Sequence, residues 1–294
     1  MGKETLFKMV SHEVICDSHD TINFHFFGDM HSDTEEFERD RFKEFINETQ
    51  KMPNSYYIGM GDYNDFASTS EKRGIESANV HDTTRILLDK LAQQSNAGVA
   101  KLLWPIKDRL IGLISGNHIW KYDDGKLSDE DLAERLSTKS LGYLCVLNIR
   151  FKFSNRGGTT KGSGSFRTIT MFLCHGKGGG RLLGTSLNKI IQMSEIIPGC
   201  DIYVQGHDHQ LFAVPKTILS VVTGRNTANH LKEKKQYFVR SGSFMKGYVP
   251  NTSNYSTTGL MKPATLGGAT IQVSFKRSDK TGIEMVEVRM KSLI

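Results

Sequence analysis

The chain has 294 residues, of which 38% are hydrophobic and 24% are charged, and its formal net charge is +6. This balance excludes a disordered chain, and no apolar run is long enough to cross a bilayer. The four cysteines form no Cys-x-x-Cys pair, which argues against a zinc–thiolate site and favours free thiols. The N-terminus lacks the apolar core of a signal peptide. We therefore expect a cytoplasmic protein without a membrane partner, and the basic excess favours an anionic one.

The first half of the sequence alternates between predicted strands and helices. Glu35 and Glu36 are expected in the first turn of the first helix, where the helix dipole favours acidic residues. The predicted strands cover residues 22–27, 55–60 and 110–115, and the predicted helices cover 34–50, 76–109 and 128–140. Residues 1–20 show no clear pattern. This alternation is typical of a parallel α/β arrangement.

The second half is rich in predicted strands, with one amphipathic helix near 185–197. The strands cover residues 143–153, 166–174, 201–205, 211–222, 236–244, 268–277 and 282–291. A connector rich in glycine, serine and threonine at 155–165 is typical of a hairpin loop rather than a domain linker. We therefore expect a single α/β domain.

Five short motifs with potential metal ligands each follow a predicted strand. Asp29 and His31 are two residues apart, so on an extended backbone their side chains would point to the same side. The motifs are Asp29-x-His31, Gly61-Asp62-x-x-Asp65, Gly116-Asn117-His118, an isolated His175, and Gly206-His207-x-His209. One such histidine alone is more often an ordinary polar residue. Five motifs in order predict a metal centre, because strand carboxyl ends meet at one edge of an α/β sheet.

The motif order resembles the calcineurin-like metallophosphoesterase family, particularly its bacterial, phage-type and repair-nuclease-like members. The matching motifs span residues 29–209. The resemblance implies a four-layer α-β-β-α sandwich of two mixed sheets flanked by helices, with a dinuclear metal site at the strand carboxyl ends. It implies one domain over 1–294, in which 210–294 complete the second sheet and include a substrate-side loop at 241–268.

The resemblance also implies which side chains hold the two divalent metal ions. Asp29, His31 and His209 would hold one metal, Asn117, His175 and His207 would hold the other, and Asp62 would bridge both. Such a shared carboxylate offsets the repulsion between two cations that lie ~3.5–4 Å apart. Mn²⁺ is the favoured metal, and Fe, Zn, Ni or Co also fit ligands that offer nitrogen and oxygen without thiolate.

His118 and Asp65 are the catalytic candidates that the resemblance implies. In the family, the histidine contacts the phosphate or protonates the leaving oxygen, and in some members the carboxylate orients that histidine. Phe66 and Ala67 depart from the Asp-Arg-Gly sequence found where the carboxylate's role is clearest, so a catalytic and a structural role for Asp65 both stay open. Ile119 stands where many members have Glu or Asp, which argues against a Ser/Thr protein phosphatase.

Two loops are candidates for substrate binding. Lys177 and Arg181 belong to a glycine-rich loop beside His175, which fits either phosphate binding or a solvated loop. The loop at 241–268 carries tyrosines and lysines, which fit either stacking on nucleic-acid bases or an incidental surface.

We predict a dinuclear metal-dependent phosphodiesterase or nuclease, in which a metal-activated hydroxide attacks nucleic acid or a nucleotide. One alternative is a phosphomonoesterase of nucleotides, metabolites or phosphoproteins, which would turn over monoesters faster than diesters. The other is a non-catalytic interaction module, which would bind fewer than two metals. The oligomeric state does not follow from the sequence.

Overall fold

The structure, a computed structural model, describes residues 7–67, 72, 74, 75, 78, 80–154, 166–177, 182–224, 227–249, 257, 263–278 and 282–292. The strands are β1 (Lys8–Cys16), β2 (Thr21–Phe27), β3 (Ser55–Gly59), β4 (Leu110–Ile114), β5 (Lys139–Gly142), β6 (Leu144–Phe153), β7 (Phe166–Cys174), β8 (Ile202–Gln205), β9 (Leu211–Gly224), β10 (Thr227–Ser243), β11 (Gly267–Ser278) and β12 (Gly282–Ser292). The helices are α1 (Arg39–Gln50), α3 (Asp82–Leu103), the 3-10 helix η1 (Trp104–Arg109), α4 (Ser128–Arg135) and α5 (Leu183–Ile196).

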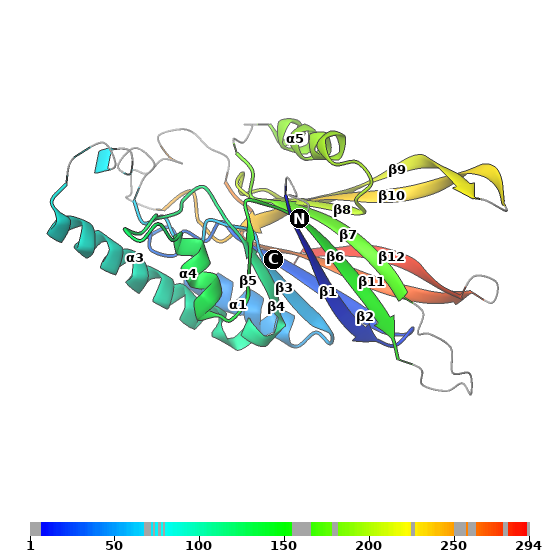
Figure 1. The fold of residues 1–294 in the computed structure, drawn as a ribbon, viewed down its shortest axis with the longest axis horizontal. Coiled ribbons are helices and arrows are strands. Elements are labelled where there is room, and N and C mark those ends of the chain that lie inside the picture. The colour runs from blue at the N-terminus through cyan, green and yellow to red at the C-terminus, as the bar shows by residue number, and fades with distance from the viewer. Residues whose placement is uncertain are drawn as a thin grey trace, which may run out of the picture.

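The strands form two mixed sheets that face each other. The first runs in the order β1-β6-β7-β8-β10-β9 and the second in the order β12-β11-β2-β3-β4-β5. A short ladder between β10 and β11 joins the sheets at one edge. Helices α1, α3 and α4 pack on the outer face of the second sheet, and α5 packs on that of the first (Figure 1). The predicted α/β sandwich of two mixed sheets with flanking helices is therefore confirmed.

The main core lies between the two sheets. Phe24 and Phe26 of β2 point into it and meet Phe151 of β6, and all three are fully buried. Because side chains alternate along a strand, Phe27 points the other way and packs under the helices. The strand therefore buries both of its faces, including its polar residues Asn23 and His25.

The helix predicted at 34–50 starts later than expected, as the shorter α1, and Glu35 and Glu36 precede it. The backbone N–H of Glu38 donates to the carbonyl oxygen of Phe244 at 2.9 Å. This stretch is therefore tied to a segment about two hundred residues away instead of forming a first helical turn. The prediction failed because the competing partner is distant in sequence.

Other boundaries also differ from the prediction. The helix expected at 128–140 is the shorter α4, because the following residues pair with β4 as β5. Residues 1–20, which had no clear pattern, contain β1, a strand that pairs in parallel with β6. The predicted hairpin loop at 155–165 lies outside the described residues, and the two strands that it joins, β6 and β7, pair antiparallel.

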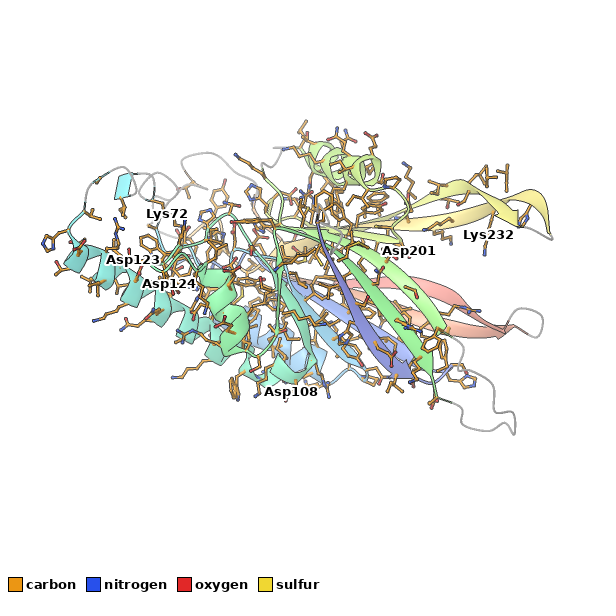
Figure 2. All side chains as sticks on the ribbon, viewed as in Figure 1. Lys72, Asp108, Asp123, Asp124, Asp201 and Lys232 are labelled. Carbon is orange, nitrogen blue, oxygen red and sulfur yellow. The ribbon has the colours of Figure 1, made fainter. Side chains whose placement is uncertain are left out.

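The strands predicted at 211–222 and 236–244 are parts of one longer hairpin, β9–β10, which projects from the first sheet (Figure 1). Lys232 lies on this hairpin (Figure 2), and Lys234 pairs with Asp201 at 2.9 Å. These lysines are thus placed on the hairpin and not at the strand ends that carry the motifs. Among the described residues, no helix has the length and apolar character needed to span a membrane.

His25 is a buried histidine whose two ring nitrogens bond to Thr270 Oγ1 at 2.9 Å and to Ser55 Oγ at 3.0 Å. Burial lowers the pKa of His25 to about 3, whereas an unfolded histidine has a pKa of about 6.5. Below the unfolded pKa, the unfolded chain binds a proton that the folded chain does not, so stability falls as the pH falls. Between pH 7 and 5, we expect the wild type to lose about 2 kcal/mol more unfolding free energy than His25→Gln. Urea denaturation of both metal-free proteins measures this difference, and equal losses would contradict the prediction.

Candidate metal centre

The predicted motifs follow the carboxyl ends of five strands, β2, β3, β4, β7 and β8. The first three are parallel neighbours in one sheet, and β7 and β8 are parallel neighbours in the other. Hydrogen bonds connect the sheets at this edge: for example, the His207 N–H donates to Asp29 Oδ2 at 2.9 Å, and His175 Nδ1 donates to the Met60 carbonyl at 2.7 Å. The strand order therefore brings motifs that are distant in sequence to one place.

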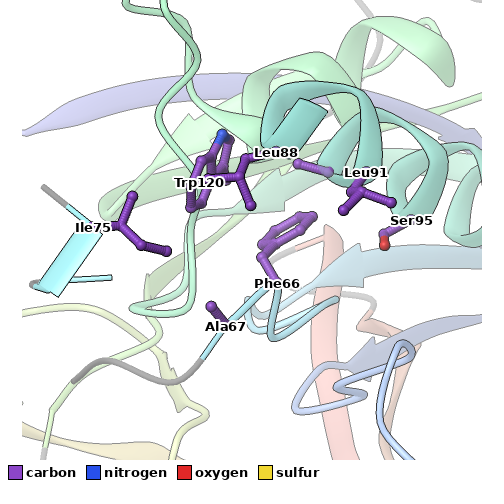
Figure 3. A pocket seen from close by; sticks show the side chains of 8 residues that line it. Phe66, Ala67, Ile75, Leu88, Leu91, Ser95 and Trp120 are labelled. Atoms are coloured by element: carbon purple, nitrogen blue, oxygen red, sulfur yellow. The ribbon is translucent and has the colours of Figure 1, made fainter. Parts of the chain in front are cut away.

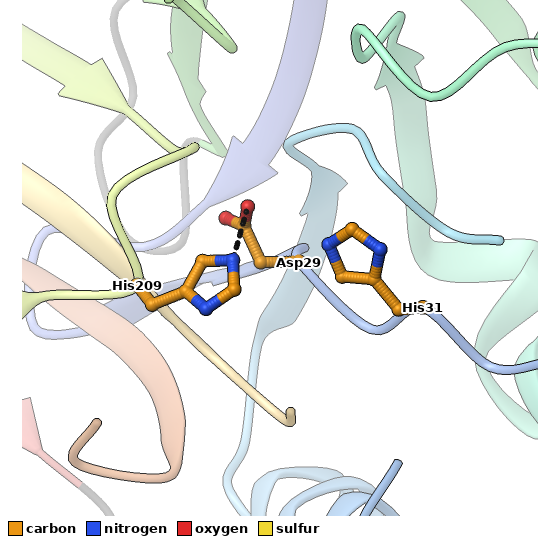
Figure 4. A group of neighbouring side chains, drawn as sticks. All are labelled: Asp29, His31 and His209. Carbon is orange, nitrogen blue, oxygen red and sulfur yellow. Dashed lines mark ion pairs between the residues drawn. The ribbon is translucent and has the colours of Figure 1, made fainter. Parts of the chain in front are cut away.

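Asp29, His31 and His209 form one group of candidate metal ligands. One potential ligand atom from each lies within 4.8 Å of the others. His209 Nε2 is 3.4 Å from Asp29 Oδ1, and the Asp29 carboxylate is fully buried. The His209 ring lies beside the Asp29 carboxylate, and the His31 ring lies on the other side of Asp29 (Figure 4).

Asp62, His175 and His207 form the second group, by the same 4.8 Å criterion. The Asn117 side chain lies among them, because its Oδ1 is 3.0 Å from His175 Nε2 and 2.7 Å from His207 Nδ1. The second group thus includes every residue that the resemblance implies for the second metal.

The Asp62 carboxylate lies between the two groups. Its Oδ2 is 2.9 Å from His175 Nε2 in the second group and 3.9 Å from His31 Nε2 in the first. Its Oδ1 accepts hydrogen bonds from the backbone N–H groups of Asn117 and His118, both at 2.9 Å. One oxygen therefore holds the neighbouring loop, while the other faces both groups.

The backbone that presents these ligands is not extended. Left-handed φ angles occur at Asp29 (46°), His31 (46°), Asp62 (51°), His207 (75°) and His209 (56°). The prediction that Asp29 and His31 point to the same side because their backbone is extended was therefore wrong. The chain turns at both residues instead. Such conformations cost about 1–3 kcal/mol each for residues other than glycine, and they persist only where the surroundings fix them.

Gly116 makes close approach possible between two of these turns. A Cβ at this position would overlap both Oδ1 and the backbone nitrogen of Asp62. We expect Gly116→Ala to lower the unfolding free energy by about 1–3 kcal/mol, as overpacking does elsewhere, and to weaken Mn²⁺ binding. Gly98→Ala is the matched control, because a Cβ on Gly98 meets nothing within 4 Å. Denaturation and calorimetric titration of both variants measure the effect, and equal Mn²⁺ affinities would contradict it.

The buried charges of the centre shift one another's protonation. Burial raises the pKa of Asp29 to about 6. Burial alone would also raise the pKa of Asp62, but the neighbouring His175 lowers it below its usual value. Burial lowers the pKa of His207 to about 4 and that of His209 to about 3. The Asp62 carboxylate is thus ionised and the His207 and His209 imidazoles are neutral, which are the protonation states that metal ligation requires.

The orientation of His175 fits a cation at this position. A carbonyl oxygen can only accept, so the bond to Met60 places a proton on Nδ1 and leaves Nε2 facing oxygens of Asp62 and Asn117. These electron-rich atoms need a positive charge between them. Without a metal, a proton supplies it: burial would lower the pKa of His175, but Asp62 and Asp29 raise it to about 9.

Two buried polar atoms in the first group have no hydrogen-bond partner among the described residues, namely Asp29 Oδ1 and His31 Nδ1. Leaving such atoms unsatisfied costs about 1–3 kcal/mol each. A bound cation would satisfy the carboxylate oxygen. The residues present therefore fit divalent metal ions, with nitrogen and oxygen ligands and no thiolate.

His118 and Asp65 lie together at the more exposed side of the centre. His118 Nδ1 is hydrogen-bonded to Asp65 Oδ1, and the two side chains are 20% and 27% exposed. Burial would raise the pKa of Asp65, but its hydrogen bond to His118 and the nearby His31 ring, 3.8 Å away, lower it below its usual value. Asp33 fixes the turn by accepting the backbone N–H of Asp65 at 2.6 Å. The hydrogen bond between His118 and Asp65 is the contact that an orienting role for Asp65 requires.

The predicted substrate-binding residues are only partly described. Lys177 is exposed beside the centre, whereas Arg181 lies outside the described residues. In the loop at 241–268, Lys246 pairs with Glu38 at 3.2 Å, so its charge is already engaged. Lys262 and Tyr255 of this loop, which were predicted with it, lie outside the described residues.

Sequence reasoning missed several residues that support the centre. The buried Asp129 carboxylate accepts the N–H of Gly116 at 3.0 Å, and Ser128 Oγ accepts that of Trp120 at 3.0 Å. From the sequence, Ser128 and Asp129 were interpreted only as the start of the helix predicted at 128–140. Lys72 Nζ donates to the carbonyl oxygen of Asp65 at 2.8 Å, and no sequence motif marks it.

A small apolar pocket is lined in part by residues that lie close in sequence to His118 and Asp65 (Figure 3). Its lining includes Phe66, which follows Asp65, and Trp120, two residues beyond His118. Its volume is about 60 Å³. Because a cavity of about 150 Å³ takes a benzene ring, this pocket is too small to enclose a nucleobase.

No protein-family profile and no curated protein matches the chain. Among solved structures, the chain is similar to the calcineurin-like phosphoesterase YfkN from Bacillus subtilis, with 10% identity and a TM-score of 0.38 over 93% of this chain and 90% of that one. It is similar to Vps29 from Chaetomium thermophilum, with 10% identity and a TM-score of 0.37 over 93% of this chain and 96% of that one. It is also similar to the NAD nucleotidase of Haemophilus influenzae, with 9% identity and a TM-score of 0.39 over 94% of this chain and 51% of that one. At TM-scores below 0.5, these likenesses decide neither activity nor substrate. Two facing sheets with ligand groups at their strand ends are nevertheless the calcineurin-like arrangement that the motifs predict.

Proposed function

We propose that this chain is a dinuclear metal-dependent phosphoesterase that hydrolyses phosphodiesters of nucleic acid or of a nucleotide. The main support is that two groups of candidate ligands meet at the Asp62 carboxylate, beside the His118–Asp65 pair. When bound, two divalent cations polarise the phosphoryl group and lower the pKa of a water. Mn²⁺ is the metal that we propose for activity.

In this proposal, the ligand side chains bind the cations, and His118 and Asp65 together protonate the leaving group. Asp65 accepts a hydrogen bond from the Nδ1–H of His118, so Nε2 is the nitrogen that gives a proton to the leaving oxygen. The lowered pKa of Asp65 keeps it ionised, so its carboxylate accepts the hydrogen bond that fixes the His118 ring. His118 therefore acts as the general acid, and Asp65 acts as the residue that orients it.

A polyanionic substrate is supported by the charge of the chain and by the cations near the pair. The net charge is +6, which attracts phosphate chains by long-range electrostatics. Lys72 is held beside Asp65, and Lys177 is exposed one residue beyond Gly176. Such ammonium groups would bind phosphates of a polynucleotide next to the one that is cleaved.

A substrate panel tests the proposal. We expect Mn²⁺-dependent turnover of bis(p-nitrophenyl) phosphate and of single-stranded or duplex DNA or RNA, above the turnover of p-nitrophenyl phosphate. Chelation and the variant Asn117→Ala should both abolish it. Faster monoester turnover would contradict the diesterase assignment, and no metal-dependent hydrolysis of any substrate would contradict the phosphoesterase assignment.

A further inference from the structure

Arg240, in β10, is a charged residue inside the protein, with a side chain that is only 1% exposed. Its guanidinium donates to the Gly206 carbonyl at 3.0 Å and to the Ser186 carbonyl at 2.9 Å, and it lies 3.3 Å from Asp208 Oδ2. Its Nε has no hydrogen-bond partner among the described residues. Buried ion pairs of this kind are often no more stable than apolar replacements. Stability alone therefore does not explain the arginine.

The contacts of Arg240 converge on the turn at residues 206–209, which presents two candidate metal ligands. His207 and His209 both have left-handed φ angles, 75° and 56°. The residue between them, Asp208, accepts hydrogen bonds from the Ser186 hydroxyl and from the N–H of Gln210 at 3.3 Å. Because a left-handed backbone is unfavourable for histidine, the turn needs such external contacts to persist.

The two histidines of this turn serve different metal groups. His207 Nδ1 is 2.7 Å from Asn117 Oδ1 in the second group, and His209 Nε2 is 3.4 Å from Asp29 Oδ1 in the first. Strand β10 supports the first group again at its end, where Ser243 Oγ donates to the Asp29 carbonyl at 2.9 Å. A change in the turn would therefore disturb both groups together.

We propose that Arg240 is a positioning residue for the metal centre, which fixes the turn at 206–209 so that His207 and His209 point at their two metals. The inference rests on the proposed metal centre but not on its substrate. The guanidinium is suited to this role because its planar fork bonds one backbone carbonyl of the turn, one carboxylate of the turn and the first turn of α5 at once.

Arg240→Met tests the proposal by removing the charge while keeping much of the volume. We expect the Kd for Mn²⁺, measured by isothermal titration calorimetry, to rise about 10–100-fold, as when other supports of metal ligands are removed. Gln236→Met is the matched control: Gln236 is on the same strand, is buried, and bonds to the Cys200 carbonyl at 3.0 Å, away from the turn. The control should lower Tm without changing the Kd. Unchanged Kd values in both variants, with Tm lowered in both, would make Arg240 a merely structural residue and overturn the proposal.

Two further measurements keep the test decisive. If Arg240→Met does not fold, Arg240→Lys keeps the positive charge but lacks the planar fork that reaches the Gly206 and Ser186 carbonyls and Asp208 at once: a Kd raised at least threefold would support the proposal, and an unchanged Kd would overturn it. Crystals of the metal-free variant give a readout that needs no metal, because His207 and His209 should leave their left-handed conformations. If the wild type binds no Mn²⁺, the proposed metal centre fails, and this crystallographic comparison still decides the role of Arg240 in holding the turn.

Discussion

Asp62→Asn is expected to lower Mn²⁺-dependent phosphodiester hydrolysis by about a thousandfold or more, because a bridging carboxylate stabilises two cations by several kcal/mol. The Asp62 carboxylate faces His175 at 2.9 Å and His31 at 3.9 Å, so it lies between the two groups. An amide has nearly the same shape but places no negative charge between two cations. Steady-state kinetics and metal content per chain, measured on the same sample, test this expectation.

Asp108→Asn is the matched control, because Asp108 is an exposed carboxylate on η1 (Figure 2). It makes the same chemical change away from the centre and should leave both rate and metal content unchanged. The metal content of Asp62→Asn should fall below two ions per chain, or the ions should bind more weakly. A variant that keeps full activity and both metals would exclude Asp62 as the bridging ligand.

His118→Ala is expected to lower kcat on DNA or a dinucleotide by about 10²–10⁴, which is the usual contribution of a general acid. The reason is that these substrates release an alkoxide, which needs a proton as it leaves. On bis(p-nitrophenyl) phosphate, whose leaving group is a weak base, the same variant should lose much less. The ratio of the two rate losses measures the proton transfer separately from substrate binding.

His19→Ala provides the control for the histidine change, because His19 is exposed and has no place in the centre. It should behave as the wild type on both substrates. The His118→Ala protein should still bind two metals at the two groups that Asp62 faces, because His118 lies in a third candidate group, with His31 and Asp65. Equal losses on both substrates would show that His118 binds the phosphate and does not protonate the leaving group.

The convergence of the ligands was predictable because each motif follows an apolar strand directly. Asp29 follows β2 and Asp62 follows β3, and parallel neighbours bring their carboxyl ends to one edge. The local backbone was not predictable in the same way. Left-handed φ angles at these two aspartates depend on contacts between turns, such as the fit of Gly116 against Asp62, and a single stretch of sequence does not contain them.

The residues that support the candidate ligands were harder to predict than the meeting of the candidate ligands at one edge. Arg240 follows an apolar stretch of β10, and a charge at such a position is the only local sign of its burial. Its partners, Gly206 and Ser186, come from a loop and from α5, so the contacts exist only in the folded chain. Asp129 is a second case, because a helix-start pattern explains its presence without the Gly116 contact.

Anomalous diffraction from crystals grown with Mn²⁺ tests the central claim most directly. Two manganese peaks about 3.5–4 Å apart should lie on either side of the Asp62 carboxylate, with His209 and Asp29 at one peak and His175 and His207 at the other. No peak at this edge of the sheets, or a single peak at saturating Mn²⁺, would contradict a dinuclear centre.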